Sequence, residues 1–442
     1  MIGSYFPESD MHCSDTASEF THRGDPLADR AIALDLFDRR LVPRLRQPSL
    51  LSGAHGRIEQ VLFTLPSWIL RYQRQPEIRG TARAVRSLLQ QLPDHTRYLL
   101  VTHREAETAL ATWRDELGIS DRSDVVTLPN RLKFGSWPQD SFAVCFDRSS
   151  ERKYLVEPVP QRSPEDAYAT ALMAAATRSD RTQAALCFQG GNMLVGDDFW
   201  LLGMDSAVRT VQLGLAPRAA GESRRAALNR AFAEQLDDRR TLHLIGSRIP
   251  VPGFSQDARV IKATIGRQTW DEVTYQGNGT GTQQPVFHID AFVTLAGRDS
   301  TGAYTLVVGD PAMAAELTGQ EPPAHAMQPV FDDIAQQLQI LGFNVVRNPL
   351  PLVYHDDEIS RVRAWYFATA NNAVVEITDT TKQVWLPTYE SEEHPGLEPT
   401  DRANVEIWQG LGFEVHLLAD FHSFARNLGA AHCLAKCLGR SG

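Results

Sequence analysis

The residues best suited to chemistry lie close to the C-terminus, where Cys433 follows His432 behind the small residues Gly429-Ala430-Ala431. A thiolate is a strong nucleophile that is small enough to attack a carbon centre beside a positive charge. Two earlier segments could supply the other groups: Trp137-Pro138-Gln139-Asp140 offers a carboxylate, and Phe287-His288-Ile289-Asp290 offers an imidazole and a second carboxylate. Together these residue types predict chemistry on a cationic carbon centre such as that of a guanidinium group.

Each group has an expected role in such a reaction. A guanidinium is planar and permanently charged, and its N–H donors match the two oxygens of a carboxylate, so Asp140 and Asp290 are expected to hold it. Cys433 is expected to attack the central carbon. Ammonia is a poor leaving group unless it is protonated, so the reaction needs a group that donates a proton and later takes one from water. His288 fits this role, and we expect it on the same face of a strand as Asp290.

Taken alone, each motif also has an ordinary structural interpretation. The segment ending at Asp140 could be a turn into a strand, His288 and Asp290 could be a hydrogen-bonded core pair or two metal ligands, and Cys433 could be a small buried hydrophobic residue. The order of the three motifs favours the catalytic interpretation. A metallohydrolase that uses His288, Asp290 and His432 is a more distant alternative, and we predict neither a metal site nor a cofactor.

Composition narrows the range of partners. The chain has 442 residues, a formal net charge of -10, 43% hydrophobic and 22% charged residues. Its basic residues are dispersed among acids, so nucleic acid is not an expected partner. The five cysteines are odd in number, which favours reduced thiols, and Cys433 and Cys437 lack the second pair that a zinc site needs. Residues 1–19 resemble neither a signal peptide nor a membrane span, so we expect a cytoplasmic enzyme without membrane contact.

Strand-like and helix-like segments alternate from residue 57 onward, which is typical of an α/β protein. The expected strands are Ile58–Leu65, Arg97–Thr102, Asp124–Leu128, Ser141–Phe146, Ala184–Phe188, Asn192–Val195, Phe199–Leu202, Ala291–Leu295, Thr305–Val308, Asn344–Arg347, Ala364–Ala368, Ala373–Ile377, Val384–Leu386 and Glu414–Leu417. The expected helices are Gly80–Gln91, Glu105–Leu117, Pro164–Thr177 with Ser163 as its N-cap, Glu222–Gln235, His325–Leu341 and Asp401–Leu411. Repeats of strand, strand, helix and strand without a Pro/Ser-rich linker predict one catalytic domain, residues 51–442, after a partly ordered N-terminal extension, residues 1–50.

The order of these motifs resembles the guanidino-group-modifying enzymes of the pentein superfamily, which include agmatine, arginine and protein-arginine deiminases and amidinotransferases. The resemblance spans roughly residues 58–438 and also includes Gly190-Gly191-Asn192, Asn371-Asn372 and Val384–Tyr389. It implies a five-bladed, pseudo-fivefold α/β propeller with the site in its central channel. It also implies that Cys433 forms a covalent thiouronium-type intermediate, that His288 shuttles protons, and that Asp140 and Asp290 hold the guanidinium. The residues that we expect to contact substrate are Trp137, Gln189, Asn192 and Asn371.

One departure from the family pattern concerns the substrate. Small-molecule deiminases generally have Glu before the Gly-Gly pair, whereas Gln189 stands here and supplies no negative charge. Protein-arginine deiminases lack that motif, and the residues around Asp140 and His288 resemble theirs more closely. Those enzymes, however, carry further domains that this chain is too short to hold. The sequence therefore leaves open free arginine, agmatine, a peptidyl arginine or a metabolite guanidine as substrate.

The sequence also leaves the reaction class and the assembly open. An amidinotransferase and a non-catalytic guanidine-binding protein are the alternatives to a hydrolase, and a homo-oligomer is compatible with the chain. Residues Gly277–Thr282 could form a lid over the site or a plain flexible connection. Arg361 and Arg363 could pair with a substrate carboxylate, although a solvated strand face would also explain them.

Overall fold

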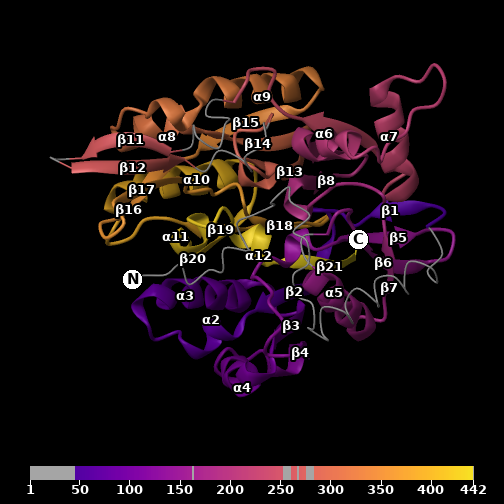
Figure 1. Ribbon diagram of the computed structural model, residues 1–442, viewed down its shortest axis with the longest axis horizontal. Coiled ribbons are helices and arrows are strands. Elements are labelled where there is room, and N and C mark those ends of the chain that lie inside the picture. The colour runs from indigo at the N-terminus through magenta and orange to yellow at the C-terminus, as the bar shows by residue number, and fades with distance from the viewer. Residues whose placement is uncertain (1–44, 162–163, 252–259, 266–267, 275–282, 442) are drawn as a thin grey trace.

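The chain folds into β-sheets with helices packed on their outer sides (Figure 1). The structure is a computed structural model, and it describes residues 45–161, 164–251, 260–265, 268–274 and 283–441. Within these residues there are six sheets, so the predicted α/β class is confirmed. The described residues contain no helix that is long and apolar enough to cross a bilayer.

Five of these sheets share one pairing pattern, in which a first strand pairs antiparallel with a second and the second pairs parallel with a third. Each sheet is listed here by its strands in spatial order. They are β21 (Lys436–Ser441), β2 (Arg57–Leu65), β3 (Arg97–His103) and β4 (Ser123–Leu128); β1 (Pro48–Leu50), β5 (Ala143–Asp147), β6 (Arg152–Glu157) and β7 (Asp180–Gln183); β8 (Met193–Val195), β9 (Phe199–Gly203) and β10 (Thr241–Ile245); β13 (Val293–Arg298), β14 (Tyr304–Asp310) and β15 (Asn344–Pro349); and β18 (Val374–Ile377), β19 (Lys382–Thr388) and β20 (Glu414–Asp420).

The sixth sheet does not follow this pattern, and most of it was not expected from the sequence. It consists of β11 (Val260–Ile265), β12 (Gln268–Thr274), β17 (Val362–Phe367) and β16 (Leu352–Asp357), in that spatial order. Only β17 matches a predicted strand. The hairpins β11–β12 and β16–β17 are separated by the whole β13–β15 sheet in the sequence, and polar residues interrupt the apolar pattern in β12 and β16.

Helices cover the sheets and begin at recognisable sequence signals. They are α2 (Ser67–Arg71), α3 (Pro76–Gln91), α4 (Glu107–Glu116), α5 (Pro164–Ala176), α6 (Met204–Gln212), α7 (Arg224–Gln235), α8 (Pro311–Thr318), α9 (Gln328–Ile340), α10 (Glu398–Gly410), α11 (His422–Ala425) and α12 (Ala431–Leu434). The Ser223 side chain accepts a hydrogen bond from the Ala226 N–H and caps α7. Asp310 caps α8 in the same way, ahead of Pro311 at its first position. The helices α2, α6, α8, α11 and α12 were not predicted.

The predicted strand Ala184–Phe188 is wrong. The strand in this region is β7, which ends at Gln183, and the residues after it are irregular although several are buried. The backbone bonds of these residues are divided between backbone and side-chain partners. The Ala184 N–H donates to the Glu157 carbonyl and the Leu186 carbonyl accepts from the Val159 N–H, whereas the Cys187 N–H donates to the Thr210 hydroxyl and the Ala185 N–H donates to the Gln235 amide oxygen. An apolar run therefore looked like a strand without forming one.

Some predictions fall outside the described residues, namely the N-cap Ser163, the glycine-rich segment 277–282 and residues 1–44 of the extension. The last part of the predicted extension is described: β1 pairs with β5 and so belongs to a sheet. The division of the chain at residue 50 stays a prediction.

Large aromatic side chains fill the core between the sheets. One buried cluster contains Phe63, Trp113, Trp385 and Phe421 and extends to Cys433. Figure 1 shows the short helix α12, which carries Cys433, near the middle of the molecule with the sheets arranged around it. The candidate nucleophile is therefore held by packed side chains on several sides.

Candidate active site

The candidate residues come from equivalent places in the five similar sheets. Each lies in or beside the short segment just before the strand that begins the shared antiparallel–parallel pattern. In this way η4 (Pro138–Asp140) precedes β5, η5 (Gly190–Asn192) precedes β8, η7 (Ile289–Ala291) precedes β13, residues 371–372 precede β18, and α12 precedes β21. The 3₁₀-helices η4, η5 and η7 contact one another in sequence order, and η4 contacts α12. The fold thus gathers residues that are up to about 300 positions apart in the sequence.

Cys433 is buried, and its sulfur lies between an amide and a carboxylate. The Asn372 Nδ2 donates to Sγ at 3.2 Å, and Sγ lies 3.5 Å from Oδ2 of Asp290. The Oδ1 of Asn372 accepts hydrogen bonds from the backbone N–H groups of Cys433 at 3.1 Å and Ala430 at 2.9 Å. One amide side chain therefore fixes both the loop before the cysteine and the sulfur itself.

The charge around this thiol is negative. Burial, followed by the carboxylates of Asp290 and Asp140, raises the pKa of Cys433 well above its usual range, against a smaller opposing effect of the Asn372 hydrogen bond. Without a ligand the sulfur is therefore a protonated thiol at neutral pH. A cation bound beside the two carboxylates would lower the thiol pKa, so the site is arranged to become nucleophilic when a positively charged ligand arrives.

Asp290 also bonds to the residue before the cysteine. Its Oδ2 lies 2.7 Å from Nδ1 of His432, and Nε2 of His432 lies 3.3 Å from Nε2 of Gln139. Asp290 therefore contacts Cys433 and His432 with a single oxygen. Its other oxygen, Oδ1, is buried and has no hydrogen-bond partner among the described residues.

His288 lies on the other side of this carboxylate. Its Nε2 contacts Oε1 of Gln189 at 2.5 Å, and its Nδ1 lies 3.8 Å from Oδ1 of Asp140. In the neutral tautomer that donates from Nε2 to this amide oxygen, Nδ1 is an acceptor. This Nδ1 is the second buried atom of the site that lacks a hydrogen-bond partner within the described chain.

The predicted placement of His288 and Asp290 on one face of a strand is wrong. Residues Ile289–Ala291 form the 3₁₀-helix η7, and the strand begins only at Val293. The Oδ1 of Asn192 accepts a hydrogen bond from the Ile289 N–H and holds this turn in place. As a result the imidazole and the carboxylate do not bond to each other but have separate partners.

A glycine leaves room between these groups. A Cβ atom added to Gly191 would lie 2.5 Å from Nδ1 of His288 and 3.2 Å from Oδ1 of Asp290. The Gly191 N–H donates to Oδ1 of Asp140 at 3.0 Å and so positions the second carboxylate. The two unpartnered atoms, Nδ1 of His288 and Oδ1 of Asp290, thus lie beside the same Gly191 backbone that holds Asp140.

Three residues expected to contact substrate have other contacts in the structure. The ring of Trp137 packs edge-on against Phe424, with 5.6 Å between ring centroids, and lies under the loop before Cys433. Asn192 holds η7 and Gln284. Asn371 donates to the Val307 carbonyl and to Asn348, so its side chain bonds away from Cys433. Their roles as ligand contacts stay predictions.

Three further residues that contact the candidate site were not assigned to it from the sequence. Asn372 is next to the predicted Asn371, and His432 was considered only as a metal ligand. The third is Lys436, which is buried and donates from Nζ to the Gln139 carbonyl at 3.1 Å. Burial lowers the pKa of Lys436 to about 8, although nearby Asp140 opposes this effect. Asn372 lies just before a strand, as Asp140 and His288 do, and this position could have identified it as a site residue from the sequence.

The described residues contain no cluster of three or more His, Cys, Asp or Glu side chains that could hold a metal ion. Within the same residues, Cys145, Cys433 and Cys437 are free thiols. The guanidinium of Arg363, which was considered as a partner for a substrate carboxylate, makes two hydrogen bonds of 2.7 Å to the Asp356 carboxylate. Arg363 is therefore already paired.

Known structures share this fold. Agmatine deiminase from C. jejuni matches with a TM-score of 0.57 at 12% identity, covering 90% of this chain and 98% of that one. Agmatine deiminase of Enterococcus faecalis matches with a TM-score of 0.54 at 11% identity, with 90% and 96% covered. A Porphyromonas gingivalis protein provisionally named an arginine deiminase matches with a TM-score of 0.55 at 18% identity, with 88% and 97% covered.

No protein-family model and no curated protein matches the chain. The three structural matches confirm the expected likeness to deiminases for the fold. At identities of 11–18% it establishes the fold alone, and the activity has to be argued from the residues of this chain.

Proposed function

We propose that this protein is a cysteine-dependent hydrolase that converts a guanidino group into a ureido group and releases ammonia. The observation that carries the proposal is the set of side chains that meet beside Gly191. They are the carboxylates of Asp140 and Asp290 and the imidazole of His288, and two of their atoms, Oδ1 of Asp290 and Nδ1 of His288, lack hydrogen-bond partners among the described residues. A guanidinium supplies five N–H donors and one positive charge, which complement these carboxylates.

The proposed reaction begins with binding. Asp140 and Asp290 hold the guanidinium, and its charge offsets the carboxylates that keep the Cys433 thiol protonated. The thiol then loses its proton to Nδ1 of His288, and the sulfur attacks the central carbon to form a carbon–sulfur bond. The amide of Asn372, which donates to Sγ at 3.2 Å, stabilises the thiolate and aims it.

Two proton transfers by His288 complete the reaction. The imidazolium gives its proton to the leaving nitrogen, the carbon–nitrogen bond breaks, and ammonia departs from a thiouronium intermediate. Water then attacks the same carbon and loses a proton to His288. The carbon–sulfur bond breaks, the sulfur takes the proton of the carbon-bound hydroxyl group, and a neutral ureido product is left. His288 releases the proton that it took from water, so that ammonia ends as ammonium.

The proposed architecture is a five-bladed propeller with the site on its axis. Five sheets with the same pairing pattern support it, as do the contacts that join neighbouring sheets: β2 with η4, η4 with η5, η5 with η7, β13 with β18, and β18 with β2. These contacts return to the sheet in which they started. In this arrangement the sixth sheet is an addition to the ring.

Gln189 fits a catalytic site better than a purely binding site. Its amide oxygen contacts Nε2 of His288, which fixes the orientation and the tautomer of the ring that moves protons. A protein that only bound guanidines would need neither an oriented imidazole nor a thiol held between Asn372 and Asp290. We therefore assign Gln189 a positioning role for His288.

The proposal is tested by ammonia release from arginine, agmatine, a peptidyl arginine and uncharged-tail guanidines. Wild-type protein should release ammonia from at least one of these guanidines. The Cys433→Ala variant should release ammonia from none of them, and the Cys437→Ala variant should release it at the wild-type rate. Ammonia that appears equally with Cys433→Ala would overturn the mechanism.

Addition of glycine or ornithine to the assay tests the nearest alternative. If the amine becomes amidinated while little ureido product forms, the protein is an amidinotransferase that uses the same intermediate. Binding of guanidines without any covalent adduct on Cys433 would instead indicate a non-catalytic guanidine-binding protein.

A further inference from the structure

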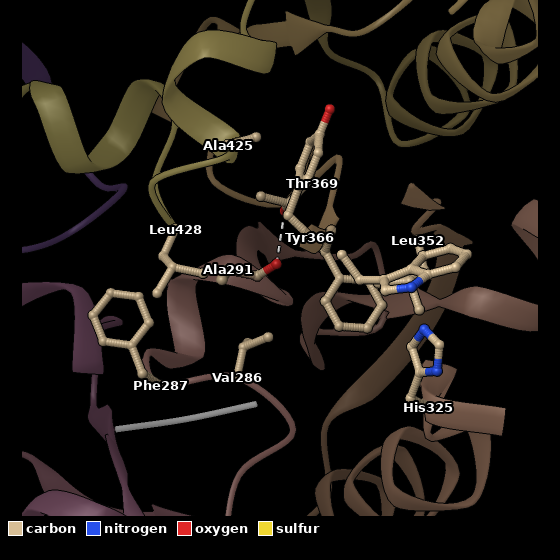
Figure 2. A pocket seen from close by; sticks show the side chains of 11 residues that line it. Val286, Phe287, Ala291, His325, Leu352, Tyr366, Thr369, Ala425 and Leu428 are labelled. Carbon is tan, nitrogen blue, oxygen red and sulfur yellow. Dashed lines mark hydrogen bonds between the residues drawn. The ribbon is translucent and has the colours of Figure 1, made fainter. Parts of the chain in front are cut away.

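A mostly apolar pocket lies next to the candidate active site. Phe287 and Leu428 line one side of it and His325 and Leu352 line the opposite side, as Figure 2 shows. Trp365, on strand β17, also contributes to the lining. The empty space within it is about 450 Å³ when the solvent at its open mouth is included.

The same segments build the pocket and the site. Phe287 precedes His288, and the two rings stack with 3.7 Å between centroids. Ala291 follows Asp290, and its carbonyl accepts a hydrogen bond of 2.7 Å from the Thr369 hydroxyl in the pocket wall (Figure 2). Leu428 belongs to the loop that leads to Cys433. A substrate held at Cys433 would therefore extend its far end toward this pocket.

The far wall of the pocket comes from the sixth sheet. Leu352 lies on β16 and Trp365 on β17, both outside the five sheets that share a pairing pattern. The Trp365 ring is fixed by a hydrogen bond from its Nε1 to Glu272 on β12 and by edge-on contacts with the rings of His325 and Tyr354. This sheet thus presents a rigid aromatic surface to the pocket.

The lining residues carry no carboxylate, ammonium or guanidinium group. Burial lowers the pKa of His325, so its imidazole is neutral at neutral pH. The Tyr366 hydroxyl is already bonded to Nδ1 of His422 at 2.7 Å, and that of Thr369 to Ala291. A charged tail in this pocket would lose its hydration without gaining an ion pair, whereas an apolar tail would be stabilised by burial.

We propose that this pocket selects guanidines whose far end is uncharged and apolar, above all aromatic, over arginine and agmatine. The inference rests on the proposed function for the identity of the reacting group. The phenyl or branched alkyl end of the substrate lies between Phe287 and Trp365 while the guanidinium lies beside Asp290. The sixth sheet is then the element that sets substrate specificity.

The test measures binding by calorimetry in the Cys433→Ala protein, so that no ligand is consumed. The ligands are 4-phenylbutylguanidine, butylguanidine and agmatine, which share a four-carbon chain and differ only at its end. Phenylbutylguanidine should bind at least about tenfold more tightly than butylguanidine, and agmatine more weakly than both. The added substitution Trp365→Ala should remove most of the phenyl advantage and leave butylguanidine affinity unchanged.

Two further variants control for folding. Tyr354→Ala removes a ring that packs on Trp365 from outside the pocket and should keep the ligand order. Leu352→Glu places a carboxylate in the pocket and should make agmatine the tighter ligand. Equal affinity of the phenyl and butyl compounds, or an equal loss of both in Trp365→Ala, would overturn the inference. The predicted order of affinities can be observed even if no guanidine releases ammonia. The selectivity of the pocket and the hydrolase function are therefore tested independently.

Discussion

At the scale of single residues, the main feature is a thiol that is held in an unreactive state by its surroundings. Cys433 is buried beside Asp290, and both burial and the carboxylates raise its pKa. Such a cysteine is protected from unwanted alkylation and oxidation, because the thiolate is the reactive form. A bound cation would offset these carboxylates, so the proposed function couples the reactivity of Cys433 to substrate binding.

This coupling predicts a contrast between two alkylating reagents of nearly equal shape. The cation 2-chloroacetamidine should modify Cys433 at neutral pH at least about tenfold faster than neutral 2-chloroacetamide, because only the cation offsets Asp140 and Asp290. The half-buried Cys437 serves as an internal control and should not show this preference. Peptide mass spectrometry measures both rates. Equal modification of Cys433 by the two reagents would contradict the electrostatic account.

At the scale of elements, short turns before strands position the reactive groups. A 3₁₀-helix exposes its backbone N–H groups and directs side chains inward at the point where the chain enters a sheet. The Gly191 N–H in η5 holds Asp140 in this way, and Asn192 at the end of the same turn holds η7. Two neighbouring turns therefore support each other, and small changes in one should displace the residues of the next.

Substitution of Gly191 tests this dependence. An alanine Cβ would lie 2.5 Å from Nδ1 of His288, which is closer than atoms can approach, so the imidazole or the turn must move. We expect Gly191→Ala to lower kcat/KM at least about 100-fold, since displacements of about 1 Å have such effects on catalysis. The control is Gly80→Ala in helix α3, where a Cβ has only ordinary contacts at 3.6 Å. It should leave activity unchanged; comparable activity of the Gly191 variant would disprove the crowding.

Strand β21 carries a buried cation that predicts a pH dependence of stability. The pKa of Lys436 is about 8 in the folded protein, below its ordinary value of 10.5, because burial disfavours the charged form. Between these two values the unfolded chain binds more protons than the folded one, so stability increases as pH rises from about 8 to about 10.5. The increase amounts to about 3 kcal/mol.

The variant Lys436→Met should lack this increase. Free energies of unfolding from urea titrations at several pH values measure the difference between variant and wild type, which cancels the titration of other groups. That difference should change by about 3 kcal/mol across the interval, in favour of wild type at high pH. Lys133→Met, at an exposed position, is the control and should follow the wild-type curve. A constant difference between Lys436→Met and wild type would mean that the lysine titrates normally.

At the scale of the whole molecule, the end of the described chain ties distant segments together. Strand β21 pairs with β2, so the sheet that begins near residue 57 is completed only at residue 441. The guanidinium of Arg440 donates to the carbonyls of Gly53, Ala54, Gly56 and Val375 at 2.7–2.9 Å. One side chain thus joins the segment before β2 to strand β18.

Loss of this guanidinium should destabilise the entire fold. We expect Arg440→Met to lower the free energy of unfolding by about 3 kcal/mol, because four carbonyls lose a charged donor. The matched control is Arg402→Met, which removes an exposed pair with Glu398 and should cost less than about 0.5 kcal/mol. Urea unfolding measures both. A similar small effect for the two arginines would show that water replaces the Arg440 contacts.

Local sequence determined most of the regular elements and identified Cys433 as the candidate nucleophile. Continuous apolar runs such as β3 are buried on both faces, and their composition predicts a strand without knowledge of partners. Helix α8 was missed because its residues lack an apolar periodicity, although the N-cap Asp310 and Pro311 mark its start. The order of the motifs around Asp140, His288 and Cys433 predicted the structural likeness to deiminases that the comparisons confirm, whereas the five-bladed propeller stays a prediction.

Only the tertiary structure decided which atoms meet. Asp140 is 51 residues from the Gly191 N–H that holds it, and Asp290 is 142 residues from its partner His432. The choice of Asn372 over Asn371 as the partner of the sulfur depends on a turn that reverses the direction of adjacent side chains. The sixth sheet and its pocket require strands that are far apart in sequence to pair. Sequence patterns encode burial and local geometry, whereas pairing, orientation and pKa depend on the three-dimensional surroundings that the complete fold creates.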